Sequence, residues 1–261
     1  MQTLRLLVHY KSERSQAVSL LLSHGYSWDA EIVLRSIYET TAKIVFICSA
    51  EETEQEILIA EFWQGLGAIN DQKRARKAEL TEKLFKNHDP FSAAVFSLLQ
   101  NKKLFSLDRS TNRMQRKVLE RKWSFSEILE TLSNRHLGEW SLKEIKSLLH
   151  MYGTASHLIH ANQGALNLMI DRVLRDPAER QLLENAHACR IMYDQVSMSF
   201  FCAEALRVNL KTAFRQRDGI VSALGRLSAL TSPFQKVFAE SQTEFYEMHA
   251  MDSPESSAWN G

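Results

Sequence analysis

The order of apolar and polar residues along the chain is typical of helices. Apolar residues recur in steps of three and four, the period of an amphipathic helix, with charged residues between them. This pattern predicts helices over about residues 3–23, 27–50 and 52–86, two shorter ones over 91–105 and 108–123, and further helices in the C-terminal half. We therefore expect an all-α fold, a multi-helix bundle with long central helices.

Short polar motifs mark where several helices should begin. In a Ser-x-x-Glu sequence the serine and the glutamate can cap a helix N-terminus reciprocally. The spacing occurs at Ser49–Glu52, Ser124–Glu127 and Ser141–Glu144. Asp176 followed by Pro177 gives a cap acceptor and a proline at the first helical position, so a long helix should start there. Ser232–Pro233 should open the last helix, and the helix opened by Ser141 should carry residues 150–164.

Composition supports this interpretation. Only 9 Gly and 4 Pro occur among 261 residues, too few for the many tight turns of a β protein. With 44% hydrophobic residues the chain can bury a sizeable core. We expect a single helical domain over residues 1–250 and a flexible tail over 251–261. The net charge of +1 gives no global field, so any binding of nucleic acid must be local.

Cysteine usage and hydropathy indicate the compartment. Cys48, Cys189 and Cys202 lie in apolar surroundings, which suits reduced thiols in a core. The N-terminal segment has charges inside its apolar run and no cleavage pattern, so we expect no signal peptide. The longest apolar run, residues 42–50, is about half the length that a membrane span needs. We expect a cytoplasmic protein that does not enter a membrane.

Residues 150–164 concentrate polar side chains that could do chemistry. Helical spacing would place Tyr152, Ser156 and His160 on one face, with His157 and the helix-weakening Gly153 on a neighbouring stripe. One interpretation is that these side chains are half-buried at a helix contact and satisfied by hydrogen bonds. The other is that His160 is a general acid or base, while Ser156 and Tyr152 donate to an oxyanion. Gly153 would then mark a close helix contact or room for a ligand.

Metal binding is a third interpretation of the histidines. His157 and His160 are three residues apart and could chelate an ion. Glu184 and His187 form a Glu-x-x-His motif, but a carboxylate-bridged di-metal bundle needs that motif twice. We therefore predict no metal site and no cofactor.

The helix predicted over residues 27–50 carries charges among apolar residues. Arg35 and Glu39 are four residues apart on it and need partners. They could form an ion pair at the edge of the core. Alternatively, Arg35 could face a cleft as an anion donor while Glu39 orients a histidine across it. The second alternative predicts that Arg35, Glu39 and His160 lie within hydrogen-bond or one-water reach.

Three stretches together resemble a known family. The sequences "LRSIYET", "RKWSFSEILETL" and "YGTASHLIHA" are similar to a bacterial family of unknown function, the domain of unknown function 5677, over about Gly25 to Ala161. The resemblance implies an all-α body. It also implies that the family's recurrent polar positions are Arg35, Glu39, Tyr152, Ser156 and His160. It implies no established activity.

Such helical families are similar to the HEPN superfamily, which implies a HEPN-like bundle and a metal-independent ribonuclease of toxin–antitoxin or phage-defence systems. The HEPN hallmark is an arginine followed, after four to six residues, by a histidine. Arg180 and His187, with Glu184 between them, match it and form a second candidate site outside the resemblance. By analogy a histidine would take the ribose 2′-OH proton and an arginine would stabilise the phosphorane.

Basic residues could guide such an RNA. Arg113, Arg116 and Lys117 lie in the basic segment 109–122, another basic run covers residues 73–77, and His157 could contact substrate, although charge runs are commonly solvated helix faces. A protein partner or antitoxin is also expected. The apolar stripe from Leu182 to Ala203 could pair two chains into a homodimer, or it could be an axial core helix.

The sequence therefore predicts a HEPN-like endoribonuclease or toxin-type effector of bacterial defence. The alternative is a non-catalytic helical interaction or regulatory module in a defence or toxin–antitoxin complex.

Overall fold

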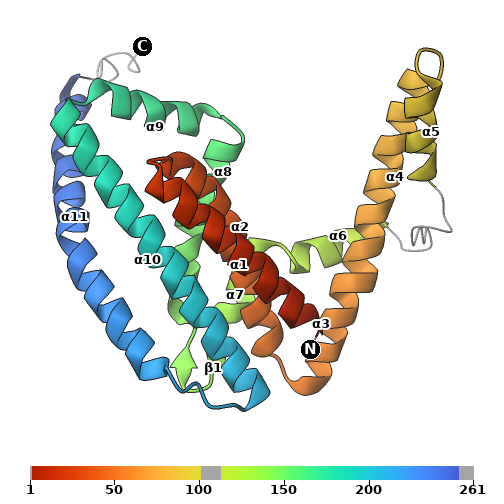
Figure 1. The fold of residues 1–261 in the computed structure, drawn as a ribbon, viewed down its shortest axis with the longest axis horizontal. Helices are drawn as coiled ribbons and strands as arrows, with labels where there is room; N and C mark the ends of the chain where they lie inside the picture. Colours follow the sequence, from red (N-terminus) through yellow and green to blue (C-terminus); the bar gives the residue numbers. More distant parts are fainter. Residues whose placement is uncertain (1, 101–112, 253–261) are drawn as a thin grey trace, which may run out of the picture.

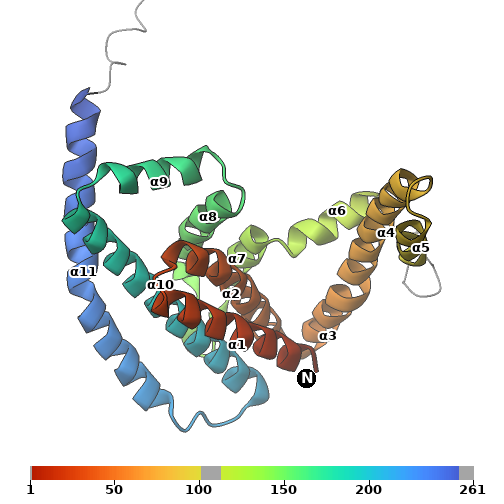
Figure 2. The same cartoon turned by 45° about the horizontal axis from the view of Figure 1, so that its top comes forward.

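A computed structural model describes residues 2–100 and 113–252. The chain is almost entirely helical, as Figures 1 and 2 show. The α-helices are α1 (Gln2–Ser23), α2 (Ser27–Cys48), α3 (Glu52–Ala60), α4 (Leu66–Phe85), α5 (Pro90–Leu98), α6 (Arg113–Lys122), α7 (Phe125–Ser133), α8 (Leu148–Ile159), α9 (Gln163–Leu174), α10 (Pro177–Leu210) and α11 (Arg217–Asp252). The all-α prediction with long central helices is confirmed. No helix in the described ranges combines the length and apolar content needed to cross a membrane.

Helix α2 is the centre of the body. It packs against α1 and α10 along most of its length, and against α7 and α8 on another side. A central helix should bury residues on several sides, and α2 does: Leu34, Ile37 and Ile44 are fully buried, and Tyr38, Thr40, Thr41 and Ala42 between them are buried too. The other helices of the body are therefore arranged around one buried axis.

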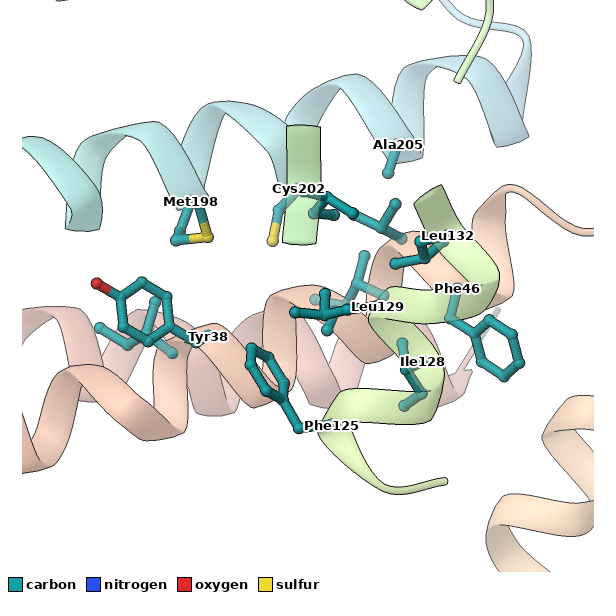
Figure 3. Close-up of a cluster of buried hydrophobic side chains, with 14 of the residues drawn as sticks. Tyr38, Phe46, Phe125, Ile128, Leu129, Leu132, Met198, Cys202 and Ala205 are labelled. Carbon is teal, nitrogen blue, oxygen red and sulfur yellow. The ribbon is translucent and has the colours of Figure 1, made fainter. Parts of the chain in front are cut away.

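The core forms where α2, α7 and α10 meet (Figure 3). The residues that fill it are Tyr38 and Phe46 from α2, Phe125, Ile128, Leu129 and Leu132 from α7, and Met198, Cys202 and Ala205 from α10. Helix α7 is short, but its start is well defined because the Ser124 hydroxyl accepts a hydrogen bond from the Glu127 amide at 3.4 Å. The predicted start at Ser124–Glu127 is confirmed. Burying each large apolar side chain contributes about 1.5–3 kcal/mol.

Helices α4 and α5 form an arm that projects from the body in both overall views. A π-helical turn, Glu61–Gly65, connects α3 to α4, so the predicted long helix is continuous except for this irregularity. The Glu61 carboxylate accepts hydrogen bonds from Lys122 at 2.9 Å and from the Trp123 indole at 3.1 Å. These contacts tie the base of the arm to α6 and the start of α7. The predicted helices over 91–105 and 108–123 extend partly outside the described residues.

The capping motifs at Ser49 and Ser141 do not cap helices. Helix α3 begins at Glu52 as predicted, but Ser49 is the C-cap of α2 and no side chain caps α3. Ser141 lies in a small antiparallel hairpin, β1 (His136–Leu137) and β2 (Trp140–Ser141), followed by a 3₁₀ turn over Lys143–Ser147. Strand pairing between residues 136 and 141 takes precedence over the local capping motif, so α8 starts later, at Leu148.

The predicted start at Asp176 is confirmed, because its carboxylate accepts from the amides of Ala178 and Glu179 at 2.8 and 3.0 Å. The predicted start at Ser232–Pro233 is wrong, since α11 runs through Pro233. Near that point Gln235 donates to the Ala186 carbonyl at 3.0 Å, so packing on α10 holds this part of α11. Of the tail predicted over 251–261, residues 251 and 252 continue α11, and residues 253–261 lie outside the described range. The single domain over 1–250 stays a prediction.

Helix α10 packs against the central helix α2 and carries the predicted apolar stripe. It packs on α2 along one side and on α11 along another, and Ala186 and Phe200 of the predicted stripe are buried. The other buried apolar positions on it are Leu183, Ile191, Met198, Cys202 and Ala205. The other residues of the predicted stripe, Leu182, Cys189, Tyr193, Val196 and Ala203, are half-buried, so the buried face of α10 lies largely on other residues and both interpretations of the stripe stay predictions. All three cysteines are free thiols, and Cys48 and Cys202 are buried.

A buried polar network links α2 to the first half of α10. Glu31, which is fully buried, accepts a hydrogen bond from His187 at 3.1 Å and forms an ion pair with Arg190. Arg190 also donates to Asp194 at 2.9 Å, and the Tyr38 hydroxyl donates to the same carboxylate at 2.6 Å. Removing one partner of such a network leaves a buried charge and costs about 3–5 kcal/mol.

Burial and neighbouring charges shift the pKa values in this network in different directions. Burial lowers the pKa of His187, and the nearby Arg190 lowers it further. Burial by itself raises the pKa of Glu31, but the hydrogen bond from His187 and the charge of Arg190 outweigh this effect and the pKa is lowered. Burial raises the pKa of Asp194. The His187 Nδ1 atom is buried without a partner in the described structure, which also disfavours the protonated ring.

We expect acid to destabilise the protein through His187. The unfolded histidine gains a proton as the pH falls through about 6.5, whereas the folded one does not, so up to about 1.4 kcal/mol of stability is lost per pH unit below that value. Denaturant unfolding of the parent and of His187→Gln at pH 7.5 and 5.5 measures this, because glutamine cannot take up the proton. Asp194, whose pKa burial raises, contributes the opposite sign, since the folded carboxylate takes up its proton at a higher pH than the unfolded one; it is present in both proteins and cancels in the comparison. An equal loss in both proteins would contradict the expectation.

Candidate functional site

Arg35, Glu39 and Tyr152 form a hydrogen-bonded cluster between α2 and α8. The Arg35 guanidinium donates to the Tyr152 hydroxyl at 2.6 Å, and that hydroxyl donates to Glu39 at 2.8 Å. Arg35 and Glu39 also form an ion pair at 3.4 Å, as expected for residues four apart on a helix. Their side chains are 21% and 33% exposed, so the cluster lies at the edge of the core and can be reached from solvent.

The Tyr152 ring is held between two neighbours. Phe125 at the start of α7 stacks on it with ring centroids 4.1 Å apart, and the Arg35 guanidinium lies 4.4 Å from its centroid. Burial raises the pKa of Tyr152, and the hydrogen bond to Glu39 raises it further, although the bond from Arg35 opposes this. The phenol therefore stays protonated at neutral pH and donates to Glu39. Arg35 is fixed by this arrangement, and its buried Nε atom has no partner in the described structure.

Ser156 and His160 follow Tyr152 along α8 at steps of four. Ser156 is half-buried and His160 is exposed. The prediction that residues 150–164 form one helix is wrong, because α8 ends at Ile159, His160 is its C-cap, and Ala161 adopts a left-handed φ of 43°. At 1.5 Å per residue, about 12 Å of helix separates Tyr152 from His160. Within the described residues no hydrogen bond or ion pair joins His160 to Arg35 or Glu39, so their shared site stays a prediction.

His157 is tied to the connection between α8 and α9. Its Nδ1 lies 2.7 Å from the Asn162 side-chain amide, and the Asn162 carbonyl oxygen caps α9 through the Ala165 amide. A Cβ atom on Gly164 would lie 3.2 Å from the His157 ring, so this glycine allows the close approach of the two helices. Gly153 has no atom within 4 Å of the corresponding position, so the expectation that it marks a close helix contact is wrong.

The second candidate site is not assembled by direct contacts. Arg180 is exposed and donates to the Arg175 carbonyl at 3.4 Å, whereas His187 is in the buried network with Glu31. About 10 Å of helix separates Arg180 from His187. Glu184, between them, is half-buried and acts electrostatically on Arg172 of α9. His187 therefore has a structural environment rather than an open cleft.

The predicted basic contacts lie on α6. Arg113 and Lys117 are exposed, and Arg116 donates to Gln72 on α4. Lys73 of the other basic run pairs with Glu120 on α6. Helix α6 packs on α4, α7 and the π-helical turn, whereas α8 packs on α2, α9 and the 3₁₀ turn. Part of this basic segment, residues 109–112, lies outside the described range.

Metal binding has little support in the described part of the chain. Within residues 2–100 and 113–252 no group of three or more His, Cys, Asp or Glu side chains is arranged to hold an ion. The pair His157 and His160 adds no third ligand there. The absence of a metal site stays a prediction.

Two residues that shape the clusters were not among the sequence candidates. Phe125 lies in a stretch of the resemblance, but its stacking on Tyr152 across 27 residues has no local signal. Glu31 is four residues before Arg35 on α2, and an acid on a helix that is apolar on most sides could have indicated a buried pair. Its partners on α10 are more than 150 residues away.

Comparisons with known proteins identify the family of the chain. No curated protein and no protein of known structure matches the chain. The model of a family of unknown function, DUF5677, matches residues 4–176. The matched range contains Arg35, Glu39, Tyr152, Ser156 and His160 and ends before His187. Because it covers well over half of the 261 residues, the chain belongs to the DUF5677 family of unknown function.

Proposed function

We propose that the protein is a HEPN-like, metal-independent endoribonuclease that acts as a toxin-type effector in bacterial defence, with its site between α2 and α8. The observation that supports this most is the Arg35–Tyr152–Glu39 cluster at a solvent-accessible edge of the core. Ser156 and His160 extend the same face of α8 toward solvent. An arginine, a hydroxyl and a histidine along one face are the groups that phosphodiester cleavage needs.

Arg35 is the phosphate-binding group in this proposal. A guanidinium offers five N–H donors in a fixed plane, and Arg35 uses one nitrogen, Nη2, for its bonds to Tyr152 and Glu39. Glu39 and Tyr152 act as positioning residues because they hold that plane in place. Ser156, one turn beyond Tyr152, can donate to a second phosphate oxygen. The protein supplies these donors already oriented, which is what lowers the barrier for a developing phosphorane.

His160 is the general base in this proposal. It takes the proton from a ribose 2′-OH, the 2′-oxygen forms a bond to phosphorus, and the bond from phosphorus to the 5′-oxygen breaks, with the leaving oxygen protonated by solvent. The products are a 2′,3′-cyclic phosphate and a 5′-hydroxyl end. Because the attacking 2′-oxygen and the phosphorus are neighbours, this proposal requires the His160 side chain to approach the phosphate on Arg35, across the about 12 Å of helix between Tyr152 and His160. Arg113, Arg116, Lys117 and His157 are proposed to contact the rest of the RNA in the cytoplasm.

We expect His160→Ala and Arg35→Gln each to lower RNA cleavage by about 10²–10⁴-fold, the usual contribution of a general base or an oriented donor. Cleavage of single-stranded RNA in excess chelator, followed on a gel with end-group analysis, measures this. His150→Ala is the matched control, because His150 is exposed on the same helix but off the face of Tyr152 and Ser156.

Three results would contradict the endoribonuclease proposal. They are no RNA cleavage by the parent protein, cleavage that stops in chelator, and cleavage that survives both substitutions. His187→Ala separates the two candidate sites, since we expect it to lower thermal stability by opening the Glu31 network. The Arg180–His187 motif would be favoured instead if His187→Ala lost RNA cleavage but kept its thermal stability, while His160→Ala kept its cleavage activity.

A specific observation favours the alternative of an interaction module. Helix α9 has its apolar face outward: five apolar side chains on it are 51–72% exposed. They are Leu166, Met169, Ile170, Val173 and Leu174. Their spacing of three and four residues makes one continuous stripe. The charged residues of α9, Asp171 and Arg172, are turned toward the body, where Arg172 lies over the Trp28 ring at 5.2 Å.

A second copy of this chain is the partner that fits the stripe. On α9, all of which the structure describes, the other exposed residues are the neutral Gln163 and Asn167. Nucleic acid or an anionic membrane would require basic residues beside the stripe. In a two-fold pairing each residue near the axis approaches its own copy, so a charge-free stripe avoids like-charge repulsion. The homodimer is therefore proposed through α9 rather than through α10, and an antitoxin-type protein would compete for the same face.

We expect the parent protein to be a dimer at tens of micromolar and Ile170→Asp to weaken the dimer at least tenfold, because a carboxylate near the axis would be buried opposite its copy. Light scattering across a dilution series measures the change, and circular dichroism checks that the helix content is kept. Val95→Asp on α5 is the control, since Val95 is also a solvent-exposed apolar residue. A parent protein that is monomeric throughout the series would show that this pairing is wrong.

A further inference from the structure

A cavity of about 760 Å³ opens at the opposite end of α10 from the buried network. It lies where the β1–β2 hairpin meets the connection from α10 to α11, a region visible beside β1 in Figure 1. Its walls include Glu139, Trp140, Arg207, Lys211, Phe214 and Arg217. The volume is within the range of sites that bind small molecules, about 300–1,000 Å³. None of these residues belongs to the α2–α8 cluster.

One buried carboxylate orients two arginines at this cavity. Glu204 is 2% exposed, and its two oxygens accept from Arg207 Nε at 3.0 Å and from Arg217 Nε at 3.1 Å. Because each guanidinium binds Glu204 through Nε, these two bonds use none of its terminal nitrogens. Arg217 also forms an ion pair with Asp218 at 3.6 Å, and this pair is weak because the Asp218 side chain is 98% exposed. Two arginines fixed by a buried acid are a built anion site rather than mobile surface charges.

Aromatic side chains form another wall. The Arg217 guanidinium lies 5.3 Å from the Trp140 ring centroid, and Trp140 is 36% exposed. Phe200 packs behind, with centroid distances of 5.6 Å to Trp140 and 6.4 Å to Phe214. Phe214 lines the cavity and is half-buried. Rings held in this way offer a planar ligand a face on which to stack.

Lys211 adds a third cation in an unusual backbone conformation. It is the C-cap of α10 and has a left-handed φ of 51°, a position at which glycine is strongly favoured. A glycine at position 211 would adopt this left-handed conformation without strain, yet the chain has a lysine there. Residues held in such conformations concentrate at functional sites. The lysine side chain at the cavity is what a glycine could not provide.

We propose that this cavity binds a phosphorylated nucleotide, with the phosphate on Arg207, Arg217 and Lys211 and the base against Phe214 or Trp140. The three cations are partly balanced by Glu204 and by Glu139 on the rim, so the site suits one phosphate monoester better than a triphosphate. The same chemistry is offered by a free mononucleotide and by the phosphorylated end of an RNA. The proposal is independent of the α2–α8 site, because it uses none of its residues.

Isothermal titration of the protein with AMP, adenosine, ATP, inorganic phosphate and a short RNA with and without a 5′-phosphate tests this proposal. We expect saturable binding of AMP or of the RNA end, at least tenfold weaker binding of adenosine, and no gain for ATP. Saturation by AMP identifies a free nucleotide as the ligand, and saturation by the phosphorylated RNA but not by AMP or by the unphosphorylated RNA identifies an RNA end. Saturation by neither AMP nor the phosphorylated RNA at millimolar concentration overturns the proposal. So does a result in which AMP binds no tighter than inorganic phosphate and the phosphorylated RNA no tighter than the unphosphorylated one.

Lys211→Gly is the most informative variant. Glycine accepts the left-handed conformation, so we expect a raised melting temperature together with at least fivefold weaker binding of the ligand. Arg217→Gln should weaken binding at least tenfold, but it also leaves Glu204 with one partner and can lower stability, which Lys211→Gly does not. Arg226→Gln on α11, whose guanidinium donates to Ser222 on its own helix, is the control. Unchanged binding in Lys211→Gly and Arg217→Gln overturns the proposal.

Discussion

The packing of the body depends on how the charges of α2 are paired. Glu31, Arg35 and Glu39 occupy successive turns of a helix that is enclosed on most sides. Glu31 is fully buried and would cost several kcal/mol without a partner, whereas Arg35 and Glu39 lie at the edge of the core, with side chains 21% and 33% exposed. Arg190 and His187 of α10 both bind the Oε2 atom of Glu31, and the Tyr152 hydroxyl of α8 bridges Arg35 and Glu39. Apolar burial supplies most of the stability, but it is non-directional, so these bonds define how α8 and α10 are placed along α2.

What could be predicted from the sequence follows from the range of each interaction. Helix period and the cap at Ser124 depend on residues within one or two turns, and they were predicted correctly. The same Ser-x-x-Glu spacing was misleading at Ser141, where the deciding contact is a strand pair with His136. Pro233 was misleading because proline is unfavourable within a helix but is tolerated when the neighbouring turns are held by packing.

The candidate site residues differ in the same way in how far the sequence could indicate them. Arg35 and Glu39 stood out because charges in an apolar helix require an explanation, and Tyr152 stood out through its spacing with Ser156 and His160. The partner of each was not visible in the sequence, since the contacts join residues more than 100 positions apart. Glu204, Arg207 and Arg217 gave no signal at all, because an acid and two arginines near a helix end look like ordinary surface residues until burial is known.

The connection between α8 and α9 joins the two proposed activities physically. His160 ends α8, Ala161 turns the chain with a left-handed φ, and Asn162 begins α9 while it contacts His157. Helix α9 packs mainly on α8, so the position of His160 depends on how firmly α9 is held. A partner that covers the apolar stripe of α9 would order this connection and thereby fix the imidazole relative to Arg35. The proposed pairing and the proposed catalysis would then both depend on the connection between α8 and α9. A protein that competes for α9 would change the position of His160 without contacting the α2–α8 cluster.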